Sequence, residues 1–451
     1  MAPLTFGTDG VRGLANAELT PELAMALGRA VARALPATTL LVGRDTRRSS
    51  AMLAAALAAG AASEGAEVTD LGVLPTPGVA ALCAKRRAPG VVVSASHNPF
   101  ADNGIKVLDV GGVKLDAATE ARIEAELSRL WAGSEVSPRP TGRAIGVVRT
   151  DGSARASYVA ALREAADVTS LSGLKIVVDC ANGAASGLAP EVLRGLGASV
   201  TSIGDEPDGC NINDKVGTTS PEALVDAVLA VGADLGLSLD GDADRCVAVD
   251  ATGAILDGDW LLALFATQRR QRGTLDGGVV VTVMTNLGFH RAMRDAGIPV
   301  VEVPVGDRHV LEALARTGWV LGGEQSGHVV FADRATTGDG LLTGILLAQL
   351  VATRGPLHAL VDGLLVTIPQ LLVNVEVVDA SALDGADEVW LAVERHRVEL
   401  GERGRVVLRA SGTESLVRIM VEAEDDGDAH RIADSLHALV LSTLGTPGAQ
   451  D

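Results

Sequence analysis

The chain of 451 residues has few cysteines and few aromatic side chains, and each shortage removes a class of function. Its four cysteines are Cys83, Cys180, Cys210 and Cys246. They lie far apart without a Cys-x-x-Cys pair, which predicts buried, reduced thiols rather than disulfides, zinc binding or redox chemistry. Aromatic residues make up 2% of the chain and Tyr158 is its only tyrosine, so no platform for stacking nucleic-acid bases is visible.

Lysine is also scarce although arginine is abundant, and the excess of acidic residues gives a formal net charge of −19. An acidic surface repels phosphate backbones, which argues against a nucleic-acid partner, and an anionic ligand would have to be held by local arginines. The only lysines are Lys85, Lys106, Lys114, Lys175 and Lys215. No uncharged apolar run approaches the ~20 residues that span a bilayer, and the N-terminus lacks a basic start followed by an apolar segment. We therefore expect a cytoplasmic protein without a membrane partner.

A strand–helix–strand pattern occurs three times along the chain. The copies open with apolar strands at residues 39–45, 175–179 and 278–283, and each last strand runs into a different polar loop, at residues 94–99, 240–245 and 323–328. Such alternation predicts α/β domains, and the segment from about Leu371 alternates like half-exposed strands followed by a helix. We expect three similar α/β domains, with mixed sheets and helices on both faces, and a C-terminal α+β domain around one central cleft. The expected boundaries are 1–150, 151–253, 254–367 and 368–451.

The first polar loop is the candidate nucleophile. The apolar residues Val91–Val93 predict a buried strand, and the loop Ser94–Pro99 follows it directly. Pro99 prevents an ordinary helix from continuing through this loop. Ser96 would then lie at the carboxyl edge of a sheet, where open α/β folds bind ligands. A plain turn or helix cap explains such a loop equally well when it is taken alone.

The second loop is the candidate metal site. Asp240, Asp242 and Asp244 stand at positions i, i+2 and i+4, which lets a wrapped loop bring three carboxylates to one point. At about 4 Å each pair repels by roughly 4 kcal/mol at an effective dielectric near 20, so the cluster calls for a cation such as Mg²⁺. The alternative is a solvated acidic turn, which is disfavoured because the loop follows a buried strand and precedes Arg245.

Two further segments carry the residue types of phosphate sites. Arg409–Glu414 joins two alternating strands and combines an arginine, hydroxyls and a glycine, which favours a phosphate cradle over a plain hairpin turn. The glycine-rich stretch Phe6–Gly13 would place Arg12 against a phosphate, unless it is a frayed leader. The segment Asn103–Lys106 follows Ser96 closely in the sequence, so we expect Lys106, one of the rare lysines, to lie near Ser96.

These motifs, in this order over nearly the whole length, resemble those of the α-D-phosphohexomutase superfamily. Within it, the segments at residues 7–13, 305–308 and 323–328 are most similar to those of the bacterial phosphoglucosamine mutase family. The resemblance implies interconversion of glucosamine 6-phosphate and glucosamine 1-phosphate, which supplies UDP-N-acetylglucosamine synthesis. It also implies that phosphorylated Ser96 donates its phosphoryl group, that glucosamine 1,6-bisphosphate is the intermediate, and that the bisphosphate turns over and returns its other phosphate to Ser96.

The resemblance also implies a role for each site residue. One Mg²⁺ per active site would be held by Ser96, Asp240, Asp242 and Asp244. Around Ser96, catalysis would involve His97, Lys106, Arg12 and Arg245. Substrate would be bound by Glu324, Ser326, His328, Asp307, Arg308, Arg409, Ser411, Gly412, Thr413 and Arg418. Lys106 is the preferred proton-transfer group, whereas His97 either assists or only orients the loop, and His328 either touches the sugar or packs.

One departure from the family pattern and three rival functions stay open. The family's phosphate loop commonly continues Glu-Pro, but this chain has Glu414-Ser415, which predicts a looser cradle rather than lost binding. The nearest rival is a phosphomannomutase or phosphoglucomutase of the same architecture. The others are a Mg²⁺-dependent phosphatase with an aspartate nucleophile and a non-catalytic sugar-phosphate binder. Small sugar phosphates are the expected partners, and a homodimer is an expectation.

Overall fold

The computed structural model describes residues 10–35, 38–133, 138–411 and 415–445. The chain divides into two compact units, the first formed by Met1–Thr282 and Val303–Asp362 and the second by Val283–Glu302 and Gly363–Asp451. Within the described residues, no helix is both long and apolar enough to cross a bilayer.

The first sheet follows the first copy of the repeat. Its strands are β1 (Val11–Leu14), β2 (Thr39–Arg44), β3 (Glu67–Val73), β4 (Gly90–Val93), β5 (Asp102–Leu108) and β6 (Val148–Thr150), in the order β1-β5-β4-β2-β3-β6. Strands β2, β3, β4 and β6 run parallel, whereas β5 is antiparallel to both β4 and β1. The sheet is therefore mixed, as expected, and its parallel strands place their carboxyl ends at one edge.

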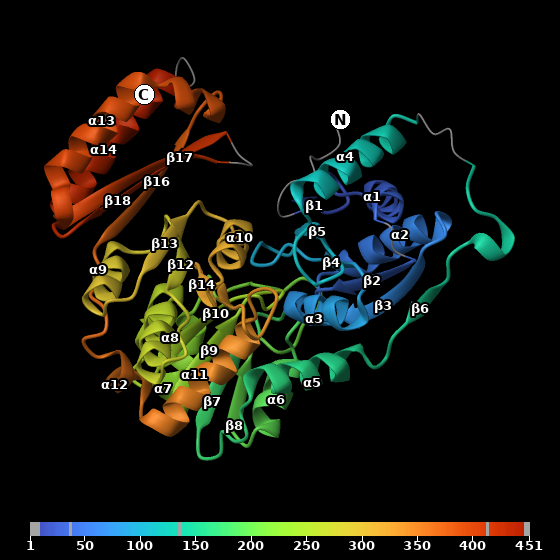
Figure 1. Ribbon diagram of the computed structural model, residues 1–451, viewed down its shortest axis with the longest axis horizontal. Coiled ribbons are helices and arrows are strands. Elements are labelled where there is room, and N and C mark those ends of the chain that lie inside the picture. The colour runs from blue at the N-terminus through green and yellow to red at the C-terminus, as the bar shows by residue number, and fades with distance from the viewer. Residues whose placement is uncertain (1–9, 36–37, 134–137, 412–414, 446–451) are drawn as a thin grey trace. The chain divides into compact units, whose positions relative to one another are not determined.

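Helices cover both faces of this sheet (Figure 1). They are α1 (Pro21–Ala34), α2 (Ser50–Ser63), α3 (Thr76–Arg86) and α4 (Ala117–Trp131). Val91 and Val93 belong to one buried core with α1, α2 and α4, while the intervening Val92 is buried on the face that α3 covers. Alternate residues of β4 thus face opposite helical layers, which explains why this strand is apolar throughout.

The second and third sheets repeat the arrangement within the first unit. The second has the order β11-β10-β9-β7-β8, and its elements are α5 (Ala154–Ala166), β7 (Lys175–Asp179), α6 (Leu188–Gly195), β8 (Ser199–Ile203), α7 (Glu222–Val231), β9 (Leu235–Leu239), β10 (Cys246–Asp250) and β11 (Ile255–Leu256). In the third, β12 (Val279–Thr282) runs parallel to β14 (Leu321–Gly323), which pairs antiparallel with β15 (Val329–Phe331). Its helices in this unit are α8 (Gly258–Arg272), α10 (Asp307–Thr317), α11 (Gly340–Arg354) and α12 (Leu357–Val361).

The second unit contains the C-terminal α+β module. Its antiparallel sheet has the order β16-β18-β17, and the elements are β16 (Gln370–Glu376), α13 (Asp387–Leu400), β17 (Gly404–Ala410), β18 (Leu416–Ala423) and α14 (Asp426–Leu444). Helices α13 and α14 pack on the sheet around an apolar core. The unit also includes α9 (Leu287–Asp295), whose first turn is capped by Asn286, and β13 (Val300–Val303) crosses the boundary between the units.

The expected fold class is confirmed, because three mixed α/β sheets are followed by an α+β module. The four domain boundaries and the single central cleft stay predictions. Helix α13 was missed by the sequence analysis, since its apolar positions are interspersed with charge and no clear cap marks its start.

Candidate active site

The serine loop begins where β4 ends, and its two serines have different partners. Ser94 Oγ donates a hydrogen bond to Asp45 Oδ2 at 2.6 Å and accepts one from the backbone N–H of Ser96 at 3.0 Å. Asp45 is itself fully occupied, because Ser50 Oγ donates to its other oxygen at 2.5 Å. The hydroxyl of Ser94 is therefore committed to holding the loop.

Ser96 instead presents its hydroxyl to residues 240–245, the candidate metal site, which is called the metal loop from here on. Its Oγ lies 2.5 Å from Asp240 Oδ2 and 3.3 Å from His97 Nδ1, and only 1% of the residue is exposed. Its backbone has φ 53°, a left-handed conformation that serine seldom adopts. The structure thus brings together the predicted nucleophile and the first predicted metal ligand, which are 144 residues apart in the sequence.

Asp240, Asp242 and Asp244 form a buried cluster after β9, in which the ligand oxygens all lie within 4.8 Å of one another. Thr76 Oγ1 donates to Asp242 Oδ2 at 2.6 Å. The Oδ1 atoms of Asp242 and Asp244 are buried and accept no hydrogen bond from the described residues. Carboxylate oxygens that are buried, close together and without donors fit a hard divalent cation such as Mg²⁺.

The charges in this cluster shift two pKa values in opposite directions. Burial raises the pKa of Asp240 well above its usual range, and the charges of Asp244 and Asp242 raise it further. Burial also raises the pKa of Asp244, but its interaction with His328 and the charges of Lys106 and Arg245 outweigh burial and hold the pKa well below its usual range. Neighbouring carboxyl groups of one loop thus have pKa values shifted in opposite directions.

Cationic side chains surround the cluster on several sides. Lys106 Nζ, from β5, lies 3.2 Å from Asp242 Oδ2 and 3.8 Å from Asp244 Oδ2. Arg245 Nε lies 3.8 Å from Asp244 Oδ1, and His328 Nδ1 lies 3.7 Å from Asp244 Oδ2. Burial lowers the pKa of His328, but Asp244 outweighs burial and raises this pKa to about 9. The raised pKa and the burial of His328 fit an imidazolium beside the metal loop.

His97 behaves in the opposite way. Burial, together with the charges of Arg245 and Arg12, lowers the pKa of His97 to about 4. The ring is therefore neutral at pH 7, so it can accept a proton but holds none to donate from an imidazolium. Arg12 lies on β1 opposite Gly104 of β5, and its buried Nε has no hydrogen-bond partner among the described residues. Both predicted side chains therefore lie near the serine loop.

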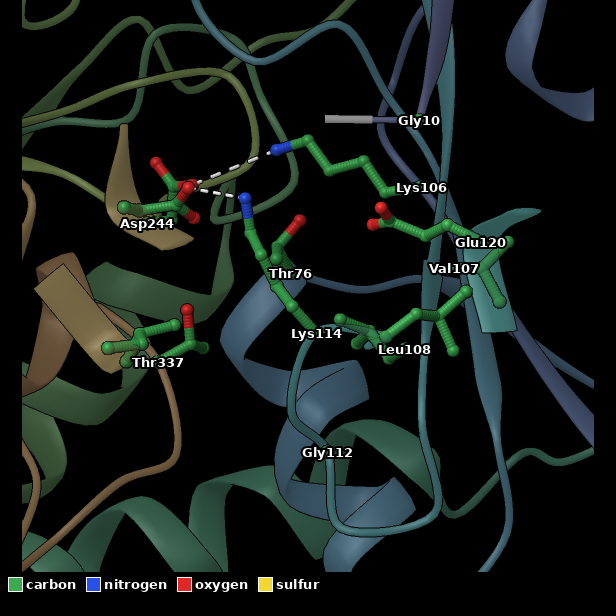
Figure 2. Close-up of a pocket in the computed structure, with 13 residues that line it drawn as sticks. Gly10, Thr76, Lys106, Val107, Leu108, Gly112, Lys114, Glu120, Asp244 and Thr337 are labelled. Carbon is green, nitrogen blue, oxygen red and sulfur yellow. Dashed lines mark hydrogen bonds and ion pairs between the residues drawn. The ribbon is translucent and has the colours of Figure 1, made fainter. Parts of the chain in front are cut away.

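A small cavity of about 30 Å³ lies beside these groups (Figure 2). Lys106 and Lys114 both extend their amino groups toward the side of the cavity where Asp244 lies. Lys114 Nζ forms an ion pair with Asp307, the first residue of α10. Two of the five lysines of this chain thus line one cavity. Only Lys106 was assigned a role from the sequence.

The third polar loop, at residues 323–328, connects β14 to β15 and is called the sugar loop for its predicted role. Glu324 is half-buried and accepts a hydrogen bond from the backbone N–H of Gly306 at 3.0 Å, whereas Ser326 is exposed. Gly327 lies against Cys246, whose backbone N–H donates to its carbonyl at 2.9 Å. The sugar loop is thereby tied to the strand that follows the metal loop.

Arg308 is occupied by contacts within the protein. Its two terminal nitrogens each lie 2.9 Å from an oxygen of Glu120, and one of them also donates to the Leu115 carbonyl at 2.6 Å. The predicted substrate roles of Arg308 and Asp307 stay predictions, and in this structure both side chains join α10 to the first α/β domain.

The predicted phosphate loop lies in the second unit, at the turn between β17 and β18. Arg409 and Arg418 stand directly opposite each other on these strands, and Ser411 follows at the end of β17. Two guanidinium groups on neighbouring strands beside a hydroxyl fit a phosphate site, because guanidinium groups bind phosphate oxygens in a bidentate manner. Gly412, Thr413 and Glu414 lie outside the described residues.

Three residues that support the serine loop from behind were not predicted from the sequence. These are Asp45 and Arg47, in the loop after β2, and Asn213, between β8 and α7. The run Arg44–Ser50 directly after a buried strand was a usable signal, because it offers several hydrogen-bonding side chains at the same sheet edge as Ser96. No comparable signal marked Asn213.

Four family descriptions match successive parts of the chain. Phosphoglucomutase/phosphomannomutase alpha/beta/alpha domain I matches residues 3–131, domain II residues 156–253, domain III residues 257–367 and the C-terminal domain residues 372–439.

Solved structures with the same fold include a phosphoglucomutase/phosphomannomutase family protein from Burkholderia thailandensis, with a TM-score of 0.81 and 27% identity over 99% of this chain and 98% of that one. The N-acetylphosphoglucosamine mutase of Aspergillus fumigatus, solved with GlcNAc-6P and magnesium, has a TM-score of 0.70 at 20% identity over 98% and 96% of the two chains. At this identity the likeness concerns the fold.

Sequence relatives are more similar. The chain is 51% identical to phosphoglucosamine mutase of Rhodococcus jostii over 445 residues, which cover 97% of this chain and 99% of that protein. It is 50% identical to phosphoglucosamine mutase of Mycobacterium marinum over 440 residues, or 96% and 97% of the two chains. With this identity along nearly the whole length, the chain belongs to the phosphoglucosamine mutase family of the phosphoglucomutase/phosphomannomutase enzymes.

Proposed function

We propose that this chain interconverts glucosamine 6-phosphate and glucosamine 1-phosphate through phosphorylated Ser96 and glucosamine 1,6-bisphosphate. The observation that carries the proposal is the buried hydroxyl of Ser96, 2.5 Å from Asp240 within a three-carboxylate cluster. Membership in the phosphoglucosamine mutase family supports this substrate. The product would feed UDP-N-acetylglucosamine synthesis.

The reaction consists of two phosphoryl transfers with no net consumption of phosphate. In the first, the bond between Ser96 Oγ and phosphorus breaks as a free sugar hydroxyl oxygen bonds to the phosphorus, and that hydroxyl loses its proton. In the second, the bisphosphate returns its other phosphoryl group to Ser96 Oγ, and the new free sugar hydroxyl gains a proton. Such transfers depend mainly on positioning and charge stabilisation, which suits a site crowded with fixed charges.

The residues divide into three groups by their proposed tasks. Asp240, Asp242, Asp244 and an oxygen at Ser96 would hold Mg²⁺, which when bound offsets negative charge on the transferring phosphoryl group. Lys106 would carry the proton of the sugar hydroxyl, since its amino group lies at the cavity edge, with Arg12, Arg245 and His97 nearby. The proposed substrate contacts are Glu324, Ser326, His328, Asp307 and Arg308 for the sugar and Arg409, Ser411, Gly412, Thr413 and Arg418 for the phosphate that is not reacting.

A phosphomannomutase or phosphoglucomutase activity is the second candidate, because the matching domain descriptions carry both names. Discrimination between an amino group and a hydroxyl at carbon 2 depends on few contacts. Comparing kcat/KM for glucosamine, glucose and mannose phosphates tests the choice. We expect the highest value for glucosamine phosphate, and an equal or higher value for mannose 1-phosphate would reject it.

The site of phosphorylation tests the chemistry. After incubation with the 1,6-bisphosphate, peptide mass analysis should find phosphate on Ser96, and Ser96→Ala should abolish both the phosphate and mutase turnover. Asp242→Asn should still fold but should lose most of its activity and its Mg²⁺-dependent rise in melting temperature. Phosphate on Asp240, or full activity of Ser96→Ala, would favour a phosphatase with an aspartate nucleophile instead.

A further inference from the structure

The backbone of Ser96 needs support that the serine itself does not provide. Its φ of 53° lies in the left-handed region, which is unfavourable for a residue with a β-carbon and persists only where the surroundings impose it. This conformation accompanies the direction of the side chain toward Asp240. The groups that bind the backbone around Ser96 therefore determine where the hydroxyl points.

Two side chains from different parts of the first unit converge on the same pair of carbonyl oxygens. Asn213 Nδ2 donates to the carbonyls of Ser96 at 2.8 Å and of Asn98 at 3.0 Å. Arg47 donates from one terminal nitrogen to the same two carbonyls, at 2.9 Å and 2.7 Å. The peptide groups Ser96–His97 and Asn98–Pro99 are thereby held by four hydrogen bonds.

Both donors are themselves fixed in place. Arg47 Nε lies 2.8 Å from Asp45 Oδ2, and neither side chain of this pair is exposed. Asn213 donates from its backbone N–H to the Ala181 carbonyl at 2.9 Å, and its own φ of 58° is one that asparagine accepts readily. A donor held from behind can impose a position on its acceptor.

The metal loop touches the same carbonyl from a third direction. A β-carbon on Gly241 would lie 2.5 Å from the Ser96 carbonyl oxygen, so the two loops are in direct backbone contact there. Any shift of this carbonyl changes the position of Ser96 relative to the neighbouring Asp240 and Asp242.

We infer that Asn213 is a positioning residue for phosphoryl transfer, acting together with Arg47 by clamping the carbonyls of Ser96 and Asn98 so that Ser96 Oγ faces Asp240. The inference rests on the proposed transfer at Ser96. Asn213 acts through the serine loop and lies outside the group of residues proposed to contact substrate. Its loss therefore slows the chemical step while leaving the binding of sugar phosphate intact.

A matched pair of variants separates positioning from loop stability. Asn213→Gly removes the two donors yet still accepts the positive φ, so it avoids backbone strain. Asn211→Gly is the control, because Asn211 belongs to the same loop, is also half-buried and also makes two hydrogen bonds to backbone, with Glu206 at 2.9 Å and Asp208 at 3.0 Å. Neither of those bonds reaches the serine loop.

We expect Asn213→Gly to lower kcat by about 10-fold or more, with KM for glucosamine phosphate within about twofold of the wild type. Asn211→Gly should keep kcat within about twofold. Asn213→Asp keeps the side-chain shape but turns the donor into an acceptor facing two carbonyls, so its kcat should be lower than that of the glycine variant. The order of kcat should be wild type, Asn213→Gly, Asn213→Asp.

Two results would overturn the inference. One is a kcat of Asn213→Gly and Asn213→Asp close to that of the wild type, and the other is an equal loss of kcat in Asn211→Gly, which would make the effect one of loop stability. If Asn213→Gly fails to fold, the near-isosteric Asn213→Asp decides on the same criteria. A wild-type enzyme without turnover of glucosamine phosphates would instead reject the proposed function, so the two failures are distinguishable.

Discussion

Two serines of one loop differ in role because of their hydrogen-bond partners. Ser94 and Ser96 are both buried, but Ser94 faces Asp45 inside the first domain whereas Ser96 faces Asp240 of the metal loop. Asp45 cannot leave its place, because it also binds Arg47 and Ser50. The chemistry of a serine here is decided by which carboxylate it meets.

The variant Ser94→Ala should separate these roles. We expect it to lower the free energy of unfolding by about 1–3 kcal/mol, because Asp45 and the backbone N–H of Ser96 each lose a partner in a buried place. Phosphate should still be found on Ser96. Denaturant titration and peptide mass analysis measure the two effects, and a phosphate that disappears while stability is unchanged would contradict this assignment.

At the level of elements, the start of α11 links the metal loop to the single tyrosine. Asp339 caps the helix by accepting from the backbone N–H of Leu342 at 2.9 Å, and Tyr158 Oη donates to its other oxygen at 2.9 Å. The next residue, Gly340, donates from its backbone to the Ala243 carbonyl of the metal loop at 3.0 Å. The helix start is therefore part of the frame that holds the metal loop.

Because the cap of α11 is the carboxyl group of Asp339, its contribution to the stability of the protein depends on pH. Burial raises the pKa of Asp339 from 3.8 to about 6, against the opposing hydrogen bonds from Leu342 and Tyr158. The folded state therefore binds a proton that the unfolded chain releases between about pH 4 and 6, so this group's contribution to stability falls as pH rises through that window.

The variant Asp339→Asn mimics the protonated form and should lack this loss. We expect its free energy of unfolding, relative to wild type, to rise by up to about 3 kcal/mol between pH 4 and pH 7. Asp179 also has a pKa that burial raises to about 6, but it is present in both proteins and cancels in the difference. Melting temperatures across this range provide the measurement, and a difference that stays constant with pH would contradict the expectation.

At the level of the whole molecule, the large first unit is held together by polar contacts between its α/β sheets as well as by apolar cores. Arg308 of α10 binds Glu120 of α4 through both terminal nitrogens, and both side chains are more than four-fifths buried. Thr336 Oγ1 adds a hydrogen bond to the Gly112 carbonyl at 2.9 Å. These contacts join α10 and the segment after β15 to the first α/β domain.

A double-mutant cycle of Arg308→Gln and Glu120→Gln measures this link. We expect each single variant to lower stability by about 2–3 kcal/mol and the coupling energy to be about 1–2 kcal/mol, since each leaves a buried partner behind. KM for glucosamine phosphate should rise in Arg308→Gln, which loses a proposed sugar contact, and should change by less than about threefold in Glu120→Gln. Additive stabilities would contradict the link, and an unchanged KM for Arg308→Gln would reject its proposed contact with the sugar.

The sequence was sufficient to propose much of the candidate site, because the candidate residues lie in contiguous loops. The apolar strand before Ser96 and the regular spacing of Asp240, Asp242 and Asp244 both follow from local pattern, and the threefold repeat of strand and helix predicted the α/β class. A buried strand needs apolar residues on both faces, and a divalent cation needs clustered oxygens, so both leave local signatures.

Only the tertiary structure decided how these loops meet. It gave Ser94 and Ser96 different hydrogen-bond partners and paired the guanidinium group of Arg308 with Glu120. It also brought Asn213 to the carbonyl of Ser96, which is 117 positions away in the chain. Such contacts join side chains that share no spacing, because they depend on the packing of whole sheets rather than on local periodicity. The sequence by itself therefore determined which residues are the candidates for the chemistry, and the tertiary structure determined which of their neighbours hold them in place.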